Sequence, residues 1–232
     1  MTPLPRPRWL TFPREPPRVR AYANLYRFGE ATASTPLLVY IGGTLNWQKY
    51  QAQYETEPVP IVTELARALA LRPLPSLDVL ICPCPLDSGG EGHEHFVEHF
   101  DDELCPELGA PPTALACVGY SAGAGLATHL AIVTEARALA VFGPAGVRRA
   151  AAADRSLFEQ FQRESARPPA VAIFRNHSDG VEAPPQVLAA ALRPMEAQAM
   201  GMRPGQHKFA DYVANGTVRD AFRFAIECLG VA

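Results

Sequence analysis

The stretch that decides the fold is Ala114-Leu115-Ala116-Cys117-Val118-Gly119-Tyr120-Ser121-Ala122-Gly123-Ala124-Gly125. Its first five residues are continuously apolar, which is typical of a strand buried on both faces of a parallel sheet. The next five have the spacing G-x-S-x-G, and the small and apolar residues that follow predict a helix over 121–134. A serine between a buried strand and a helix is typical of a turn that exposes a nucleophilic hydroxyl.

The two glycines around this serine have a steric role in our interpretation. A side chain two positions before or after the serine would collide with neighbouring elements, so Gly119 and Gly123 must be small. The turn also places the hydroxyl at a helix N-terminus, where the helix dipole favours developing negative charge. We therefore predict that Ser121 is a nucleophile. The alternative interpretation is a glycine-rich turn with an incidental serine.

Apolar runs and helical periodicities alternate along the rest of the chain. Strands are predicted over 19–28, 37–41, 77–82, 114–118, 138–142, 170–174 and 196–200, and helices over 61–71, 96–108, 121–134, 156–164, 186–192 and 211–229. This order predicts an α/β fold with a mostly parallel central sheet and helices on both faces. The Pro- and Arg-rich residues 1–18 are expected to form an extended N-terminal arm ahead of one domain over 19–232.

In such sheets the reactive groups lie just after the strands, at their carboxyl ends. Asp179 follows the strand over 170–174 and is the candidate carboxylate for orienting a histidine; Glu182 is its rival. Alternatively, Asp179 only caps or turns its loop. His207 follows the last predicted strand and can reach back to the serine as a general base. The chain order Ser121, Asp179, His207 therefore predicts a catalytic triad.

The loop after the strand over 37–41 begins Gly42-Gly43-Thr44-Leu45, and its small residues can bring a backbone N–H toward the serine. The donor can be Gly43, Thr44 or Leu45, and the alternative is a plain turn.

Four further residues are candidates for the substrate pocket, although the aromatic ones can equally serve packing alone. They are Trp47, Tyr50, Tyr120 and His93. His95 and His99 have a spacing that could hold a metal on a helix, but their acidic neighbours indicate a solvated face, and neither C-x-x-C nor H-E-x-x-H occurs. We predict no metal and no cofactor.

Composition excludes several classes of function. The net charge of −3 gives no reason to expect nucleic acid or an acidic membrane as a partner, and no apolar stretch approaches the length of a membrane span. The five cysteines are odd in number and lie mostly in apolar runs, which favours buried reduced thiols. With no signal-peptide pattern at the N-terminus, we expect a cytoplasmic protein. The many Arg, Ala and Pro residues indicate a GC-rich, bacterial genome.

Over about residues 19–229 the sequence resembles the α/β-hydrolase superfamily. The resemblance rests on GYSAG at 119–123, the Gly-Gly loop at 42–43, NHSDGVEAP at 176–184 and GQHKF at 205–209, in the family's chain order of nucleophile, acid and histidine. It implies an esterase-like serine hydrolase of one domain, whose oxyanion hole combines the N–H of Ala122 with one N–H from residues 43–45. The chain departs from the family at Tyr40-Ile41, where a histidine usually precedes Gly-Gly. The short segment before the strand over 170–174 leaves little or no room for a lid.

The resemblance leaves three functional hypotheses. The first is a hydrolase that cleaves a carboxylic ester or thioester of a small-molecule or carrier-bound acyl substrate through an acyl-enzyme on Ser121. The second is an acyltransferase or cyclase of a biosynthetic pathway that uses the same triad. The third is a non-catalytic binding protein with this fold. The sequence indicates neither the acyl group nor the oligomeric state.

Overall fold

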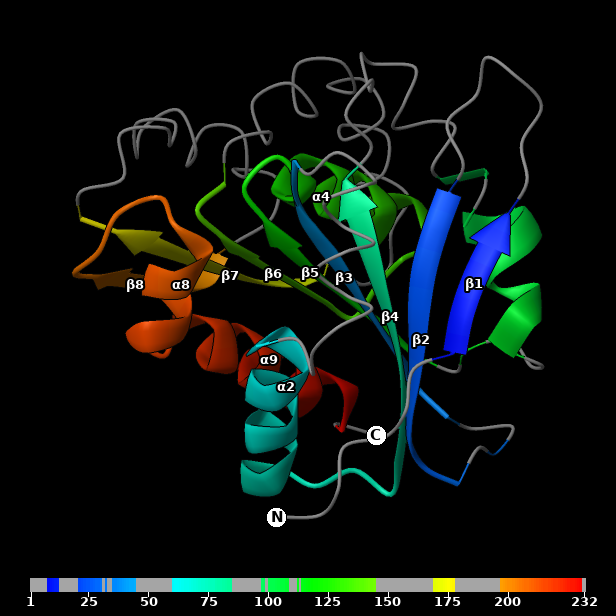
Figure 1. Cartoon of the computed structure of the whole chain (residues 1–232). Helices are drawn as coiled ribbons and strands as arrows, with labels where there is room; N and C mark the ends of the chain where they lie inside the picture. Colours follow the sequence, from blue (N-terminus) through cyan, green and yellow to red (C-terminus); the bar gives the residue numbers. More distant parts are fainter. Residues whose placement is uncertain are drawn as a thin grey trace.

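The computed structural model of the chain describes residues 8–12, 21–30, 32, 35–44, 60–84, 97–98, 100–108, 112, 114–144, 169–177 and 197–230. Within these residues the centre is an eight-stranded sheet with the order β1-β2-β4-β3-β5-β6-β7-β8 (Figure 1). The strands are β1 (Arg8–Phe12), β2 (Ala21–Gly29), β3 (Leu37–Thr44), β4 (Ser76–Cys84), β5 (Leu115–Tyr120), β6 (Ala138–Phe142), β7 (Ala170–Asn176) and β8 (Ala197–Arg203). Strands β3 to β8 run parallel to one another, whereas β2 is antiparallel to both of its neighbours.

Helices cover both faces of this sheet. One face carries α4 (Gly123–Val133), and the other carries α2 (Pro60–Leu71), α8 (Phe209–Ala214) and α9 (Thr217–Leu229) (Figure 1). A π-helical turn (Phe100–Leu104) and a 3-10 turn (Pro106–Leu108) pack into the core on the α4 side. The expected α/β fold with a mostly parallel sheet is therefore confirmed.

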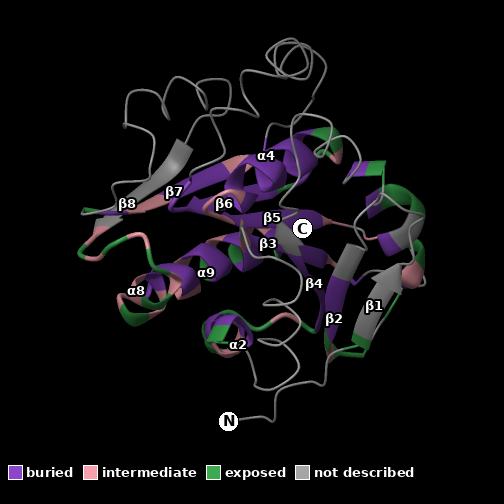
Figure 2. Ribbon diagram, turned by 45° about the horizontal axis from the view of Figure 1, so that its top comes forward, coloured by how far each residue is buried: buried purple, intermediate pink, exposed green. Residues whose placement is uncertain are grey.

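The central strands contribute side chains to two separate cores. In β3, Val39 and Ile41 pack toward α4, whereas Leu38 and Tyr40 pack toward α2 and α9. All four side chains are buried, as Figure 2 shows for the middle of the sheet. Because both faces are covered, the strand sequence is a continuous apolar run without alternation, which is the pattern that located it.

Three predicted elements differ from the structure. The prediction of one closing helix over 211–229 was wrong, because α8 and α9 are separated at Asn215 and Gly216. Gly216 has φ +80, in the left-handed region that ends a helix. The helix after the nucleophile begins at Gly123, because Ser121 also has a positive φ. Of the helix predicted over 96–108, residues 97–98 are α-helical, and the π-helical and 3-10 turns follow in place of one regular α-helix.

Other predictions fall partly or wholly on residues that the structure does not describe. The helices expected over 156–164 and 186–192, and the expectation of little or no lid, concern such residues. Within the expected N-terminal arm, β1 pairs with β2 and so joins the sheet. The division into arm and domain stays a prediction. In the described ranges, no helix has the length and apolar character that crossing a bilayer requires.

Four cysteines of the described part are free thiols: Cys82, Cys105, Cys117 and Cys228. Cys82 on β4 and Cys117 on β5 are buried. Burial raises the pKa of the Cys82 thiol to about 12 and raises the pKa of Cys117 as well. A raised pKa keeps a thiol neutral near pH 8, and the neutral form is a poor nucleophile.

We predict that Cys82 and Cys117 resist modification by an aromatic disulfide reagent at about pH 8 in the folded protein and react once guanidinium unfolds it. Mass spectrometry of the peptides that contain these two residues measures the modification. Rapid labelling of Cys82 in the folded protein would contradict the burial that we describe.

Candidate active site

Ser121 lies on the turn between β5 and α4 and has a strained backbone. Its φ is +52, a value that non-glycine residues rarely adopt. Hydrogen bonds hold it there on both sides. The Ser121 N–H donates to the Phe142 carbonyl at 3.2 Å, and the Ala124 N–H donates to the Ser121 carbonyl at 3.0 Å. Strain that the surroundings enforce at a partly buried turn is typical of a functional residue.

The glycines at positions 119 and 123 are sterically required, as the sequence predicted. A Cβ at Gly119 would lie 2.6 Å from the Cα of Ala124. A Cβ at Gly123 would lie 2.1 Å from the carbonyl oxygen of Gly42, at the end of β3. Both contacts are with backbone atoms, so neither can be relieved by moving a flexible side chain.

His207 meets Ser121 across the carboxyl end of the sheet. Its Nε2 lies 2.8 Å from the Ser121 Oγ, although the two residues are 86 positions apart in sequence. His207 follows β8 in the segment Pro204–Lys208, which we call the histidine loop. The structure therefore brings together two of the three residues of the predicted triad in hydrogen-bonding geometry.

The end of β3 lies against the same serine. A Cβ at Gly43 would be 3.3 Å from the Ser121 Cβ and 3.2 Å from the ring of Tyr120. The pairing of β3 with β4 is irregular between Ile41 and Thr44, where the strand departs from a regular ladder. Ala122 is the N-cap of α4, at a helix end where N–H groups lack intrahelical partners. Two backbone segments thus approach Ser121, as an oxyanion hole requires.

Solved structures have this arrangement of sheet and helices. A carboxyl esterase from the fungus Tuber melanosporum matches 99% of this chain and 89% of its own, with 17% identity and a TM-score of 0.61. A ferulic acid esterase from Anaeromyces mucronatus matches 99% of this chain and 92% of its own, with 13% identity and a TM-score of 0.65. A Xanthomonas campestris protein, described as an α/β serine hydrolase without a lid, matches 97% and 96%, with 18% identity and a TM-score of 0.58.

The chain adopts the α/β-hydrolase fold. At the level of sequence alone, no protein-family model and no curated protein matches it. In this α/β-hydrolase fold Ser121 follows β5 and His207 follows β8, so both predicted residues come after the carboxyl ends of parallel strands.

Most of the other predicted site residues fall outside the described part of the chain. Asp179, its rival Glu182, the oxyanion candidate Leu45, the pocket candidates Trp47, Tyr50 and His93, and the histidines 95 and 99 lie outside the described residues. Their roles stay predictions, as does the choice of donor among residues 43–45, where the sequence favours Thr44 and then Leu45. Tyr120 is described, and its ring packs against Phe142, with centroids 5.0 Å apart.

The same Tyr120 ring supports His207 from one side. The two rings are stacked, with centroids 5.6 Å apart and an interplanar angle of 21°. Tyr212 from α8 meets the imidazole edge-on at 6.5 Å. A Cβ at Gly143 would lie 3.2 Å from the His207 Cε1, so that position also borders the imidazole. Aromatic contacts thus fix the plane of the imidazole that faces Ser121.

Sequence reasoning missed a network of amide and carboxylate side chains that holds the histidine loop. The Gln206 carbonyl accepts a hydrogen bond from Asn176 Nδ2 at 2.9 Å, and the Gln206 N–H donates to Asp211 Oδ2 at 2.8 Å. Asn215 Nδ2 donates to the Pro204 carbonyl at 3.0 Å. The pair Asn215-Gly216 was a readable signal for a helix break here, whereas Asn176 was noted only as the first residue of NHSDGVEAP and not as a contact to this loop.

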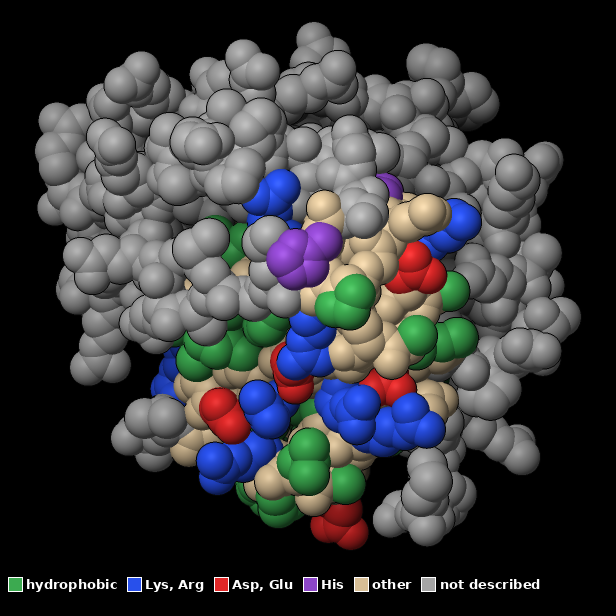
Figure 3. Space-filling view, turned by 90° about the vertical axis from the view of Figure 1, so that its left-hand side faces the viewer, with side chains coloured by type: hydrophobic (Ala, Val, Ile, Leu, Met, Phe, Trp, Pro, Cys, Tyr) green, Lys and Arg blue, Asp and Glu red, His purple; other side chains and the backbone are tan. Residues whose placement is uncertain are grey.

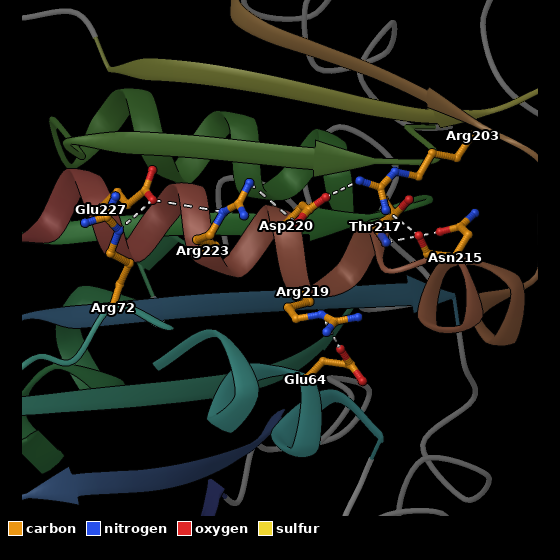
Figure 4. A network of polar contacts seen from close by, with 9 residues as sticks. All are labelled: Glu64, Arg72, Arg203, Asn215, Thr217, Arg219, Asp220, Arg223 and Glu227. Carbon is orange, nitrogen blue, oxygen red and sulfur yellow. Dashed lines mark hydrogen bonds and ion pairs between the residues drawn. The ribbon is translucent and has the colours of Figure 1, made fainter. Parts of the chain in front are cut away.

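Ion pairs continue from this network along α9. Arg203 contacts the Asn215 carbonyl and the Asp220 carboxylate, and Arg219 pairs with the buried Glu64 of α2 (Figure 4). Seen from the side of β8 and α8, basic and acidic side chains are interspersed (Figure 3). Arg219 therefore links α9 to α2, and Arg203 links β8 to α9.

We predict that Tyr120→Leu slows labelling of Ser121 by a fluorophosphonate about fivefold, because loss of about 1 kcal/mol of ring stacking loosens the imidazole. Tyr120→Phe keeps the ring and should label faster than the leucine variant. The second-order rate constant of labelling is the measurement, with melting temperature as a control. Equal rates for the leucine variant and the unaltered protein would show that the stack does not orient His207.

Proposed function

We propose that the protein is a serine hydrolase that cleaves carboxylic esters, and by the same chemistry thioesters, through an acyl-enzyme on Ser121. The observation that carries the proposal is the 2.8 Å separation between Ser121 Oγ and His207 Nε2 on a turn where Ser121 has positive φ. Stacking, hydrogen bonds and backbone strain all act on these two residues, which a merely structural serine and histidine would not need. The named structural neighbours, which are called esterases or a serine hydrolase, support this chemistry.

In the proposed mechanism His207 first acts as a general base. Its Nε2 accepts the proton of the Ser121 hydroxyl while Oγ forms a bond to the carbonyl carbon of the ester. The carbonyl oxygen becomes an oxyanion, which the N–H of Ala122 and one N–H from residues 43–45 stabilise. Collapse of this intermediate breaks the bond to the leaving alkoxide, which takes the proton back from His207. The products of this half-reaction are an alcohol and an acyl-enzyme.

Water completes the reaction in a second, equivalent half. His207 removes a proton from the water as its oxygen attacks the acyl carbon, and the proton then returns to Ser121 Oγ as the acid leaves. Asp179, which follows β7, is proposed to accept the other imidazole N–H and to stabilise the imidazolium that forms in each half. Small-molecule or carrier-bound acyl groups are the proposed substrates.

We predict that Ser121→Ala and His207→Ala each lower kcat/KM for p-nitrophenyl esters by about 10³-fold or more, because the nucleophile or its base is lost. Turnover is measured on esters of short and long acyl chains, on acyl thioesters and on peptide amides. Circular dichroism and melting temperature check that each variant is folded. Undiminished ester cleavage by folded Ser121→Ala protein would refute the mechanism, and release of the free acid distinguishes hydrolysis from transfer.

A separate prediction concerns the acid of the triad. Asp179→Asn is expected to lower kcat by about 10²- to 10⁴-fold, because a neutral amide neither fixes the imidazole tautomer nor stabilises the imidazolium. Glu182→Gln is the matched control, since it removes one charge three positions further along the chain and should change kcat little. The reverse result would assign the role to Glu182.

A further inference from the structure

We infer that Asn176 is a positioning residue for His207: its side-chain amide fixes the histidine loop at the distance from Ser121 that catalysis requires. The inference rests on the proposed function, because it assumes that His207 is the base. Asn176 is the last residue of β7 and is 3% exposed. It pairs in register with Arg203, the last residue of β8, so it lies beside the point where the histidine loop begins.

The amide of Asn176 uses both of its ends. Its Nδ2 donates to the carbonyl of Gln206, the residue before His207, at 2.9 Å. Its Oδ1 accepts a hydrogen bond from Asn215 Nδ2 at 2.8 Å. Gly205 packs directly against it, because a Cβ at that position would lie 2.7 Å from Asn176 Nδ2.

No other side chain of this size can make the same two bonds. Aspartate can accept from Asn215 but would set a carboxylate oxygen against the Gln206 carbonyl, and leucine can do neither. A buried polar group that loses its partner carries the full desolvation penalty, so the pairing favours this one loop geometry over shifted ones. The chemistry of the site therefore explains why an amide is buried at this position.

Asn215 extends the contact to the start of α9. Its Nδ2 donates to the Pro204 carbonyl as well as to Asn176, while its Oδ1 accepts from the Thr217 N–H at 3.1 Å. The histidine loop is thereby held to a helix terminus at Pro204 and to a strand at Gln206. His207 comes directly after the second of these anchors, and its Nε2 must meet Ser121 Oγ within hydrogen-bonding distance.

The position of Asn176 also connects two parts of the proposed triad. It ends the strand that leads to Asp179, three residues further on, and holds the loop that carries His207. A shift of about 1 Å between a base and its nucleophile can lower a rate by about 10²-fold. Loss of the amide should therefore act on the chemical step and not on substrate binding.

The experiment compares Asn176→Ala with Asn24→Ala. Asn24 on β2 is also buried, but its amide has no hydrogen-bond partner among the described residues, which makes it a control for removing a buried amide. Active sites are counted by fluorophosphonate labelling carried to its end point, and turnover of a p-nitrophenyl ester is divided by that count. We expect Asn176→Ala to lower kcat per active site by about 10- to 100-fold with KM changed less than about twofold, and Asn24→Ala to leave both unchanged.

A purely structural role would reduce the number of active sites or the melting temperature while leaving kcat per active site unaltered. That result would overturn the inference. If Asn176→Ala does not fold, Asn215→Ala takes its place, because Asn215 is partly exposed and its loss removes one anchor of the same loop. We expect a smaller fall in kcat per active site for this variant, about threefold to tenfold.

The His207→Ala background separates this inference from the proposed function. If Asn176 acts through His207, adding Asn176→Ala to His207→Ala should leave the residual rate unchanged, because coupled residues are not additive. An equal further fall in that background would show that Asn176 acts elsewhere and would overturn the inference alone. If His207→Ala itself leaves turnover intact, the proposed function fails, whatever Asn176 does.

Discussion

The close approach of the α4 N-terminus to the end of β3 is the constraint on which the site depends. Gly123 lies so near the carbonyls of Ile41 and Gly42 that no Cβ fits between them. Because α4 starts there, the chain leaving β5 must turn within two residues, and Ser121 takes a positive φ to do so. The same contact places the β3 end beside Ser121. One packing requirement thus produces both the turn that carries the Ser121 hydroxyl and a neighbouring backbone segment.

The parallel sheet makes the second half of the site possible. Ser121 and His207, 86 positions apart, meet because β5 and β8 have their carboxyl ends on the same side of the sheet, with β6 and β7 between them. Each intervening strand also contributes directly: the Phe142 carbonyl at the end of β6 accepts from Ser121, and Asn176 at the end of β7 donates to the histidine loop. Strand order alone would bring the loops into one region, and these bonds set the distances within it.

Much of this arrangement follows from sequence patterns with a single physical cause. Continuous apolar runs located the central strands because both faces of the sheet are covered. GYSAG located the turn because no Cβ fits at either of its two glycines. The closing helix was misjudged because its apolar periodicity continues through Asn215-Gly216, where one left-handed residue breaks it. Asn176 was noted only as the start of NHSDGVEAP and its contact to the histidine loop was missed, because the role of a buried amide depends on partners distant in sequence. Asp179 lies outside the described residues, so its place in the triad rests on chain order.

The positive φ of Ser121 also means that the hydroxyl is kept at a cost in local stability, because glycine would fit this conformation better. Glycine adopts this conformation without the steric cost of about 1–2 kcal/mol that an L-residue bears. Replacing Ser121 with glycine would therefore relieve backbone strain, but it would remove the hydroxyl on which the proposed acyl-enzyme forms. A serine at a position that glycine would occupy with less strain fits the covalent role that we propose for its hydroxyl.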